Sequence, residues 1–102
     1  MVLQYLPDDM KKCIKFVADQ AKECEVLSFR FRFQRDHGLF HLYRPYSTVT
    51  EHIEMLENPA PVLAAYGLIT IVEPEDEEDR EPAPGLLVVL AATFEAAASL
   101  DG

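Results

Sequence analysis

The sequence contains few glycines and serines, residues on which several common active-site motifs depend. None of its four glycines are grouped as in loops that cradle nucleotide phosphates. None of its three serines lies in the G-x-S-x-G turn that exposes a hydrolase nucleophile. The histidines, His37, His41 and His52, are not at metal-ligand spacing, either with each other or with the cysteines. The sequence therefore predicts no enzyme, metal site or cofactor, and a cysteine–histidine nucleophile assembled by folding is the alternative.

Long apolar runs are also absent. The longest run, residues 86–92, has seven residues, whereas a membrane-spanning helix needs about twenty. The first ten residues lack the basic segment and long apolar stretch of a secretory signal. A chain of 102 residues matches the size of one domain. We therefore expect a single soluble, cytoplasmic domain over residues 1–102, without a membrane partner.

The two cysteines, Cys13 and Cys24, lie eleven positions apart on one predicted helix. At a helical rise of about 1.5 Å per residue they are roughly 16 Å apart. A disulfide requires Cα atoms within about 7 Å, so these two cannot bond to each other. Both fall on the apolar face of the helix, which favours small buried hydrophobic residues in a reducing compartment. A metal site or a redox pair is the less favoured interpretation.

Residues 8–24 carry apolar side chains at the spacing of one helical face. Pro7, Asp8 and Asp9 suit the start of a helix, because carboxylates interact favourably with its free N–H groups. From Val26 the period changes to two, which predicts a strand, and residues 39–44 alternate in the same way. The economical connection is a hairpin with a two-residue loop, either at 36–37 or at 37–38.

The hairpin contains the sequence SFRFRFQ, in which phenylalanines alternate with arginines. With either loop the apolar side chains of the two strands lie on the same face of the hairpin. A register shifted by one residue would instead place His41 beside the phenylalanines. The apolar face comprises Phe29, Phe31, Phe33, Phe40 and Leu42. The outer face then gathers Ser28, Arg30, Arg32, Gln34, His41 and Tyr43. The alternative is an RNA-binding sheet with exposed rings, but two amphipathic helices need covering and the net charge of −9 opposes polyanion binding.

The second half of the chain predicts a helix, a strand, a loop, a strand and a short helix. Thr48 and Glu51 form a capping-box pattern, and Val49, Ile53 and Leu56 follow at helical spacing. Prolines interrupt this helix at 58–61, and Gly67 closes a short helical turn before a strand at 68–72. Residues 86–92 predict a second strand followed by a short helix, with a single helix over 84–100 as the competitor.

These elements predict an α+β domain in the order α-β-β-α-β-β-α, with an antiparallel sheet built from two hairpins and helices packed on one face. A further strand over residues 2–6 would begin a ferredoxin-like order instead.

Charge is unevenly distributed along the chain. Residues 26–46 contain four arginines and one aspartate, a balance of +3. Residues 73–81 contain seven acids and one arginine, a balance of −6. Self-repulsion and three prolines predict a mobile acidic loop at about 73–85. Its acids are Glu73, Glu75, Asp76, Glu77, Glu78, Asp79 and Glu81.

The leading hypothesis is a non-enzymatic protein-interaction or regulatory domain that binds itself, as a homodimer, or another protein. Its contact surface would be the outer sheet face or the C-terminal apolar segment. Arginine and tyrosine are enriched at protein interfaces, which favours a face made of Arg30, Arg32, His41, Tyr43 and Arg44. One alternative is an acidic inhibitor or decoy that binds a nucleic-acid-handling protein and does not itself contact nucleic acid. Another is a small-anion binder or an unrecognised enzyme.

Overall fold

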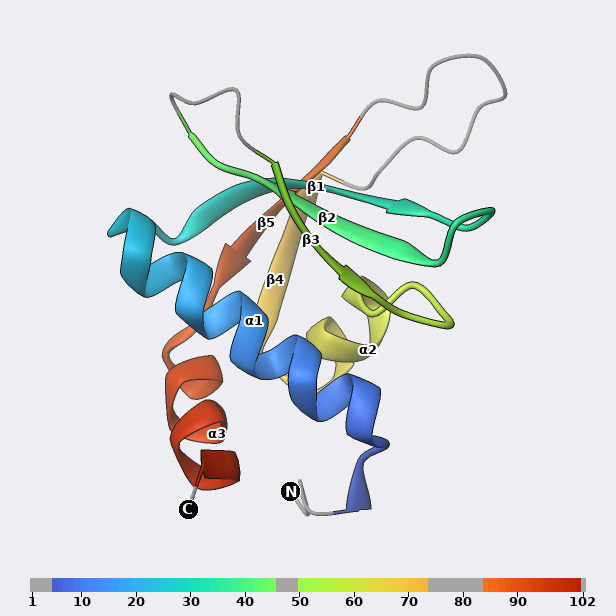
Figure 1. Ribbon diagram of the computed structural model, residues 1–102. Coiled ribbons are helices and arrows are strands. Elements are labelled where there is room, and N and C mark those ends of the chain that lie inside the picture. Colours follow the sequence, from blue (N-terminus) through green and yellow to red (C-terminus); the bar gives the residue numbers. More distant parts are fainter. Residues whose placement is uncertain (1–4, 46–49, 74–83, 102) are drawn as a thin grey trace.

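The computed structural model describes residues 5–45, 50–73 and 84–101. It is an α+β fold in which three helices lie on one side of a five-stranded antiparallel sheet (Figure 1). The elements along the chain are α1 (Asp8–Cys24), β1 (Ser28–Gln34), β2 (Leu39–Tyr43), β3 (Thr50–Glu54), α2 (Ala60–Ala65), β4 (Ile69–Glu73), β5 (Gly85–Val89) and α3 (Ala91–Asp101). The strand order across the sheet is β3-β2-β1-β5-β4.

The first helix has the bounds that its apolar spacing predicted. Pro7 is its N-cap, and an Asp9 carboxylate oxygen accepts a hydrogen bond from the Met10 backbone N–H at 2.9 Å. The helix ends at Glu25, whose φ of 55° is in the left-handed region. Its buried face, which covers the sheet, consists of Met10, Cys13, Ile14, Val17, Ala18, Gln20 and Ala21.

The β1–β2 hairpin confirms the predicted orientation of the phenylalanine row. Phe31 lies opposite Leu42 and Phe33 opposite Phe40, the register of a two-residue loop at 36–37. Of the five predicted inward side chains, Phe33 is partly buried against the core and the other four are buried. The rings therefore face the helices and are not open to base stacking. Leu27, two residues before Phe29 in the same alternation, lies just before the strand and is half exposed.

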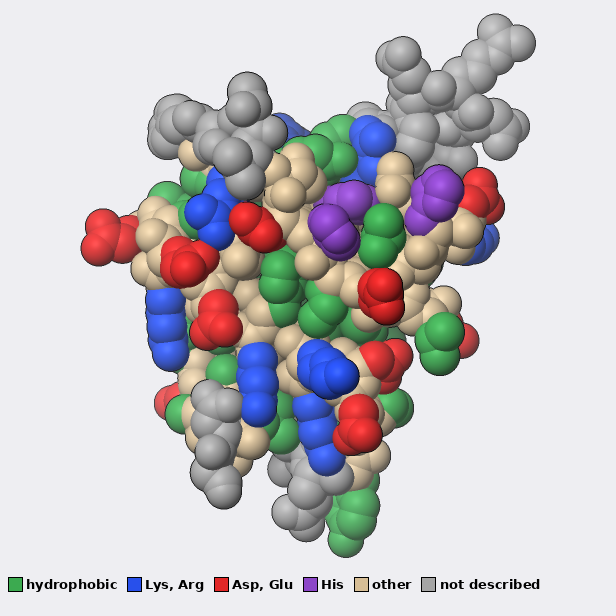
Figure 2. Space-filling view, viewed as in Figure 1, with side chains coloured by type: hydrophobic (Ala, Val, Ile, Leu, Met, Phe, Trp, Pro, Cys, Tyr) green, Lys and Arg blue, Asp and Glu red, His purple; other side chains and the backbone are tan. Residues whose placement is uncertain are grey.

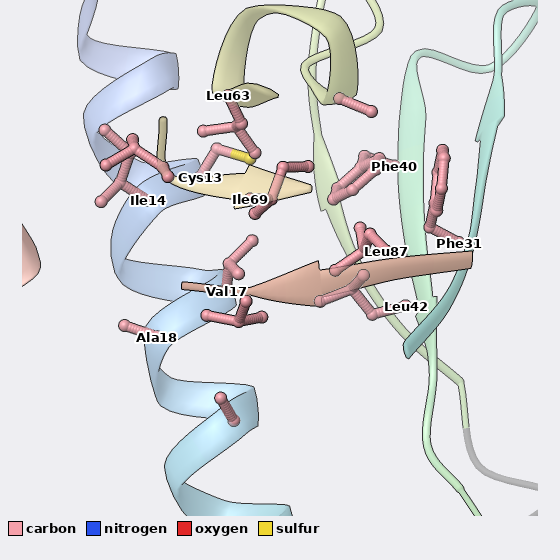
Figure 3. Close-up of a cluster of buried hydrophobic side chains, with 14 of the residues drawn as sticks. Cys13, Ile14, Val17, Ala18, Phe31, Phe40, Leu42, Leu63, Ile69 and Leu87 are labelled. Atoms are coloured by element: carbon pink, nitrogen blue, oxygen red, sulfur yellow. The ribbon is translucent and has the colours of Figure 1, made fainter. Parts of the chain in front are cut away.

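The core lies between α1 and the sheet (Figure 3). Cys13 and Val17 project from α1 towards aromatic and aliphatic side chains of the strands, and Ile14 is buried in the same cluster. Leu63 of α2 joins the same cluster. Helix α3 packs alongside α1, and its Thr93 hydroxyl donates a buried hydrogen bond to the Leu68 carbonyl.

The predicted helix beginning at Thr48 is wrong, because Thr50–Glu54 forms the edge strand β3. Thr48 itself lies outside the described residues. Phe40 is paired with Ile53 and His41 with His52, so this segment extends the sheet by one strand. Its burial pattern shows why: Ile53 packs against the core, whereas Leu56 is 91% exposed and belongs to no apolar stripe. Pairing with β2 overrides the local helix signals. The observed order is consequently α-β-β-β-α-β-β-α.

The last third of the chain follows the strand-plus-helix prediction, and the single-helix alternative over 84–100 is wrong. Strand β5 lies between β1 and β4 and alternates between buried and partly buried residues. The helix starts earlier than expected, at Ala91. Gly67 has a φ of +74°, as the predicted helix closure requires. Tyr5 and Leu6, the described part of segment 2–6, are not in a strand.

Candidate interaction face

The sheet surface turned away from the described helices is called the open face. Strand registers place its side chains in rows that cross the sheet. The central row is Glu73, Leu86, Arg30, Tyr43 and Thr50, and the adjacent row is Arg32, His41 and His52. Beyond these lie Thr70, Val88 and Ser28 on one side and Gln34, Leu39 and Glu54 on the other. The open face thus includes Arg30, Arg32, His41 and Tyr43, four of the five predicted interaction residues.

Apolar side chains lie on the open face on both sides of the central strand β1. Leu86 and Val88 come from β5, and Leu39 and Tyr43 come from β2. All four are partly buried although no described helix covers them. Sequence analysis missed the two β5 residues as members of this surface, since only the strand order places β5 beside β1. Leu86 and Val88 alternate with the buried Leu87 and Val89, and this alternation could have indicated that they lie on the opposite face of the sheet.

An ion pair crosses the central row. The Arg30 guanidinium is 2.6 Å from a Glu73 carboxylate oxygen, although strand β5 lies between their strands. The arginine side chain must therefore extend across the position of Leu86. Both side chains are about half exposed, so the pair contributes little to the free energy of folding, at most about 1 kcal/mol. Its effect is to order Arg30 along the face.

A histidine pair occupies the adjacent row. The ring centroids of His41 and His52 are 5.6 Å apart, and the rings are tilted by 50°. Nε2 of His41 lies 2.9 Å from Oε1 of Gln34, at hydrogen-bonding distance. Partial burial lowers the pKa of His41 from its ordinary value of 6.5, and the charges of His52 and Arg32 lower it further. His52 was missed as a face residue because its segment was predicted to be helical.

Arg44 does not share this face. It follows Phe40 and Leu42 at even spacing and lies on the helix side of the sheet edge. Its Nε donates to Oε1 of Gln20 at 3.0 Å, and its guanidinium is 2.7 Å from a Glu23 carboxylate oxygen. A Glu51 oxygen lies 3.6 Å away. Arg44 therefore joins α1 to the β2–β3 edge.

Of the predicted acidic loop at 73–85, the structure describes only residues 73, 84 and 85. Glu73 is the last residue of β4 and binds Arg30. The other predicted loop acids, Glu75, Asp76, Glu77, Glu78, Asp79 and Glu81, lie outside the described residues. Strands β4 and β5 flank the segment, as the two-hairpin prediction requires.

A second surface feature lies near the start of α1. A groove of about 860 Å³ is bordered by the first turn of α1, by the β1–β2 turn and by the end of β3. It carries charges of both signs, including Asp8, Asp9, Lys12 and Glu54, and its described lining residues include no serine or cysteine. The lining residues therefore provide no paired nucleophile and base.

The described residues provide little support for covalent or metal chemistry. Burial raises the pKa of the Cys13 thiol to about 12, which opposes a role as a nucleophile. Within ranges 5–45, 50–73 and 84–101, no three histidine, cysteine or acidic side chains are arranged to hold a metal ion. None of the helices in those ranges has both the length and the apolar character that a bilayer crossing demands. Figure 2 shows acidic and basic side chains intermixed over α1, with histidines gathered near the strands above it.

Comparison with known proteins adds no family to this description. No family model matches the sequence, and neither a curated protein nor a solved structure is significantly similar to it. Functional inference therefore rests on the chemistry of the open face.

Proposed function

We propose that this protein is a non-enzymatic protein-interaction domain that forms a homodimer through the open face. The observation that carries the proposal is the set of partly buried apolar side chains on a sheet surface that no described helix covers. Leu86 and Val88 of β5 and Tyr43 of β2 provide contact area, and Arg30 and Arg32 of the intervening strand β1 provide donors suited to protein partners.

The charge of the face favours a second copy over other occupants. The whole chain has a net charge of −9, so two copies repel each other overall. Among the described residues of the open face, two arginines are balanced by Glu54 and Glu73, with the histidines counted as neutral. Placing two such faces against each other therefore adds little to the overall repulsion between the copies. A near-neutral face also lacks the basic surplus that nucleic-acid binding requires.

The C-terminal apolar segment, the other predicted contact, offers less free surface. Strand β5 has neighbours on both sides, and Thr93, Ala96 and Ala97 of α3 are buried against the rest of the fold. Helix α3 uses this apolar surface to pack beside α1. The outward-facing residues of β5 belong to the open face itself. We therefore assign the contact to the sheet.

The size of the face predicts a weak dimer. Five strands spaced about 4.8 Å apart, each with five residues rising about 3.3 Å, cover roughly 400 Å² of flat area per copy. Stable complexes bury about 800 Å² per partner, so this face falls in the class of transient contacts. The association must accordingly be measured over concentrations from about 10 µM to about 1 mM, the range of weak affinities.

Sedimentation equilibrium of the intact chain tests the proposal. We expect a reversible monomer–dimer equilibrium that Leu86→Gln weakens, because the substitution removes apolar contact at the centre of the face. The matched control is Leu56→Gln, the same change at a leucine that is 91% exposed at the end of β3 and outside the open face. Circular dichroism must show that both variants are folded. A monomer at every concentration, or equal weakening by both variants, would contradict the proposal.

A further inference from the structure

The open face contains a titratable group beside a fixed positive charge. His41 lies between Arg32 of β1 and His52 of β3 in one row of the sheet. The rings of the two histidines are 5.6 Å apart, so they cannot both become charged without repulsion. Among the described acids that the strand registers place on this face, Glu54 lies in the next row, diagonal to His41. On its other side the row is bordered by the Arg30–Glu73 ion pair.

We propose that dimer formation through the open face is linked to protonation, so that the copies associate when His41 is neutral and separate when it gains a proton. This inference rests on the proposed function. It assigns the cluster of Arg32, His41 and His52 as the proton-sensitive part of the interface.

The physical basis is desolvation. A second copy placed on the face removes water from His41, which is already partly buried, and removal of water disfavours the charged imidazolium. The same exclusion of water weakens the screening between His41 and Arg32. Protonation of His41 is therefore more costly in the dimer than in the monomer. Glu54 opposes this effect, but the row itself contains one fixed positive charge and two imidazoles.

The sign of the pH dependence follows from linkage. The monomer binds more protons than the dimer around the pKa of His41, so the dimer is favoured as pH rises. Below pH 6.5, the ordinary histidine value from which His41 is lowered, the dissociation constant increases as pH falls. One linked proton changes the dissociation constant by at most about tenfold per pH unit. One proton in each of the two copies therefore changes it by at most about a hundredfold per pH unit.

Sedimentation equilibrium across pH tests this inference. The intact protein is compared with His41→Gln and with the control His37→Gln, which changes a histidine in the β1–β2 turn. Measurements run from about pH 8 to about pH 5 at constant ionic strength, a range that spans histidine titration. We expect the dissociation constants of the wild type and His37→Gln to rise together on acidification. The constant of His41→Gln should change less steeply.

A second measurement separates failure of this inference from failure of the proposed function. NMR titration of the dilute monomer follows the His41 imidazole directly, with assignment by the His→Gln variants. If the protein dimerises through the open face but its affinity is independent of pH, or increases in acid, the proton linkage is wrong and the proposed function stands. If the protein is monomeric at every pH, both are wrong. If the pKa of His41 in the monomer is 6.5 or higher, burial and the neighbouring charges do not lower it, and the proton linkage is wrong.

Discussion

Replacement of Phe31 by alanine tests the orientation of the hairpin, on which the open face depends. The Phe31 side chain is 1% exposed, and its ring centroid lies 6.2 Å from that of Phe40. Removing a buried phenylalanine ring costs about 3–5 kcal/mol, through lost transfer free energy and the cavity left behind. A domain of this size has a free energy of unfolding of about 5–15 kcal/mol. We therefore expect Phe31→Ala to lose a large fraction of the stability. The neighbouring Arg30→Ala should cost less than about 1 kcal/mol.

Urea denaturation followed by circular dichroism measures both effects. With a slope of about 1–3 kcal/mol per molar urea, the midpoint of Phe31→Ala should fall by roughly 1–5 M, whereas that of Arg30→Ala should shift little. Phe31→Leu keeps part of the side chain and remains measurable if the alanine variant does not fold, with an expected loss of about 1–2 kcal/mol. A greater loss of unfolding free energy for Arg30→Ala than for Phe31→Leu would indicate that the arginine face is the buried one and would refute this account.

Three further predictions concern the turns, the cysteines and the sheet edge. Gly38→Ala should destabilise the protein more than Gly67→Ala in urea denaturation. Both glycines have a positive φ, which strains any residue with a side chain. A Cβ at position 38 would also lie 3.1 Å from a backbone carbonyl oxygen, whereas a Cβ at position 67 would have no neighbouring atom within 4 Å. In the native protein, a thiol reagent should modify the partly buried Cys24 before Cys13, because burial raises the pKa of Cys13 to about 12; equal rates measured by mass spectrometry would contradict its burial. Arg44→Ala should lower the free energy of unfolding by about 1 kcal/mol yet leave the dimer dissociation constant unchanged, since its contacts lie on the helix side.

The first helix and the hairpin were predictable because their local signals agree with their tertiary environment. In α1 the apolar spacing, the acidic first turn and the buried face all coincide. In β1 the alternation is strict, and a two-residue loop at either position keeps Phe40 and Leu42 beside the phenylalanine row, as the observed register does. These patterns, the apolar spacing of α1 and the alternation of the hairpin strands, are each contained within one short continuous segment of the chain. Strong periodicity over such a segment therefore defines both the element and its buried side.

Strand β3 was not predictable in this way, because its local signals and its environment conflict. Glu51 suggests a capping box, and Ile53 and Leu56 are spaced as on a helix. In the structure, Glu51 lies near Arg44, Ile53 packs on the core and Leu56 is exposed. The deciding contact is the pairing with β2, whose other edge is already occupied by β1. Such pairing is a property of the sheet and not of residues 50–54 alone.

The candidate face was predictable in part. Alternation within the hairpin correctly grouped Arg30, Arg32, His41 and Tyr43. The same parity placed Arg44 with the inward residues of β2, so its inclusion in the predicted face conflicted with a signal already in the sequence. The Arg30–Glu73 ion pair required knowledge that β5 and β4 follow β1 in the sheet. The side chains that complete the face come from strands distant in sequence.

The salt dependence of dimerisation distinguishes apolar contact from ion pairing as the basis of the interface. If Arg30 and Arg32 bound acids of the second copy, added salt would screen those pairs and raise the dissociation constant. Arg30, however, already binds Glu73 within its own chain, and two chains of charge −9 repel each other overall. Screening this repulsion favours association, while apolar contact between Leu86 and its surroundings is insensitive to moderate salt.

We therefore expect the dissociation constant to fall as salt rises from about 50 mM to about 500 mM, as the Debye length shortens from roughly 14 Å to roughly 4 Å. Sedimentation equilibrium of the wild type and of Arg32→Gln at both concentrations provides the measurement. The arginine variant should keep the same direction of change, because its net negative charge, and with it the repulsion that salt screens, remains. The opposite result would be a wild-type dissociation constant that rises with salt and an Arg32→Gln constant that does not. It would show that intermolecular ion pairs, and not the apolar side chains of the open face, hold the copies together.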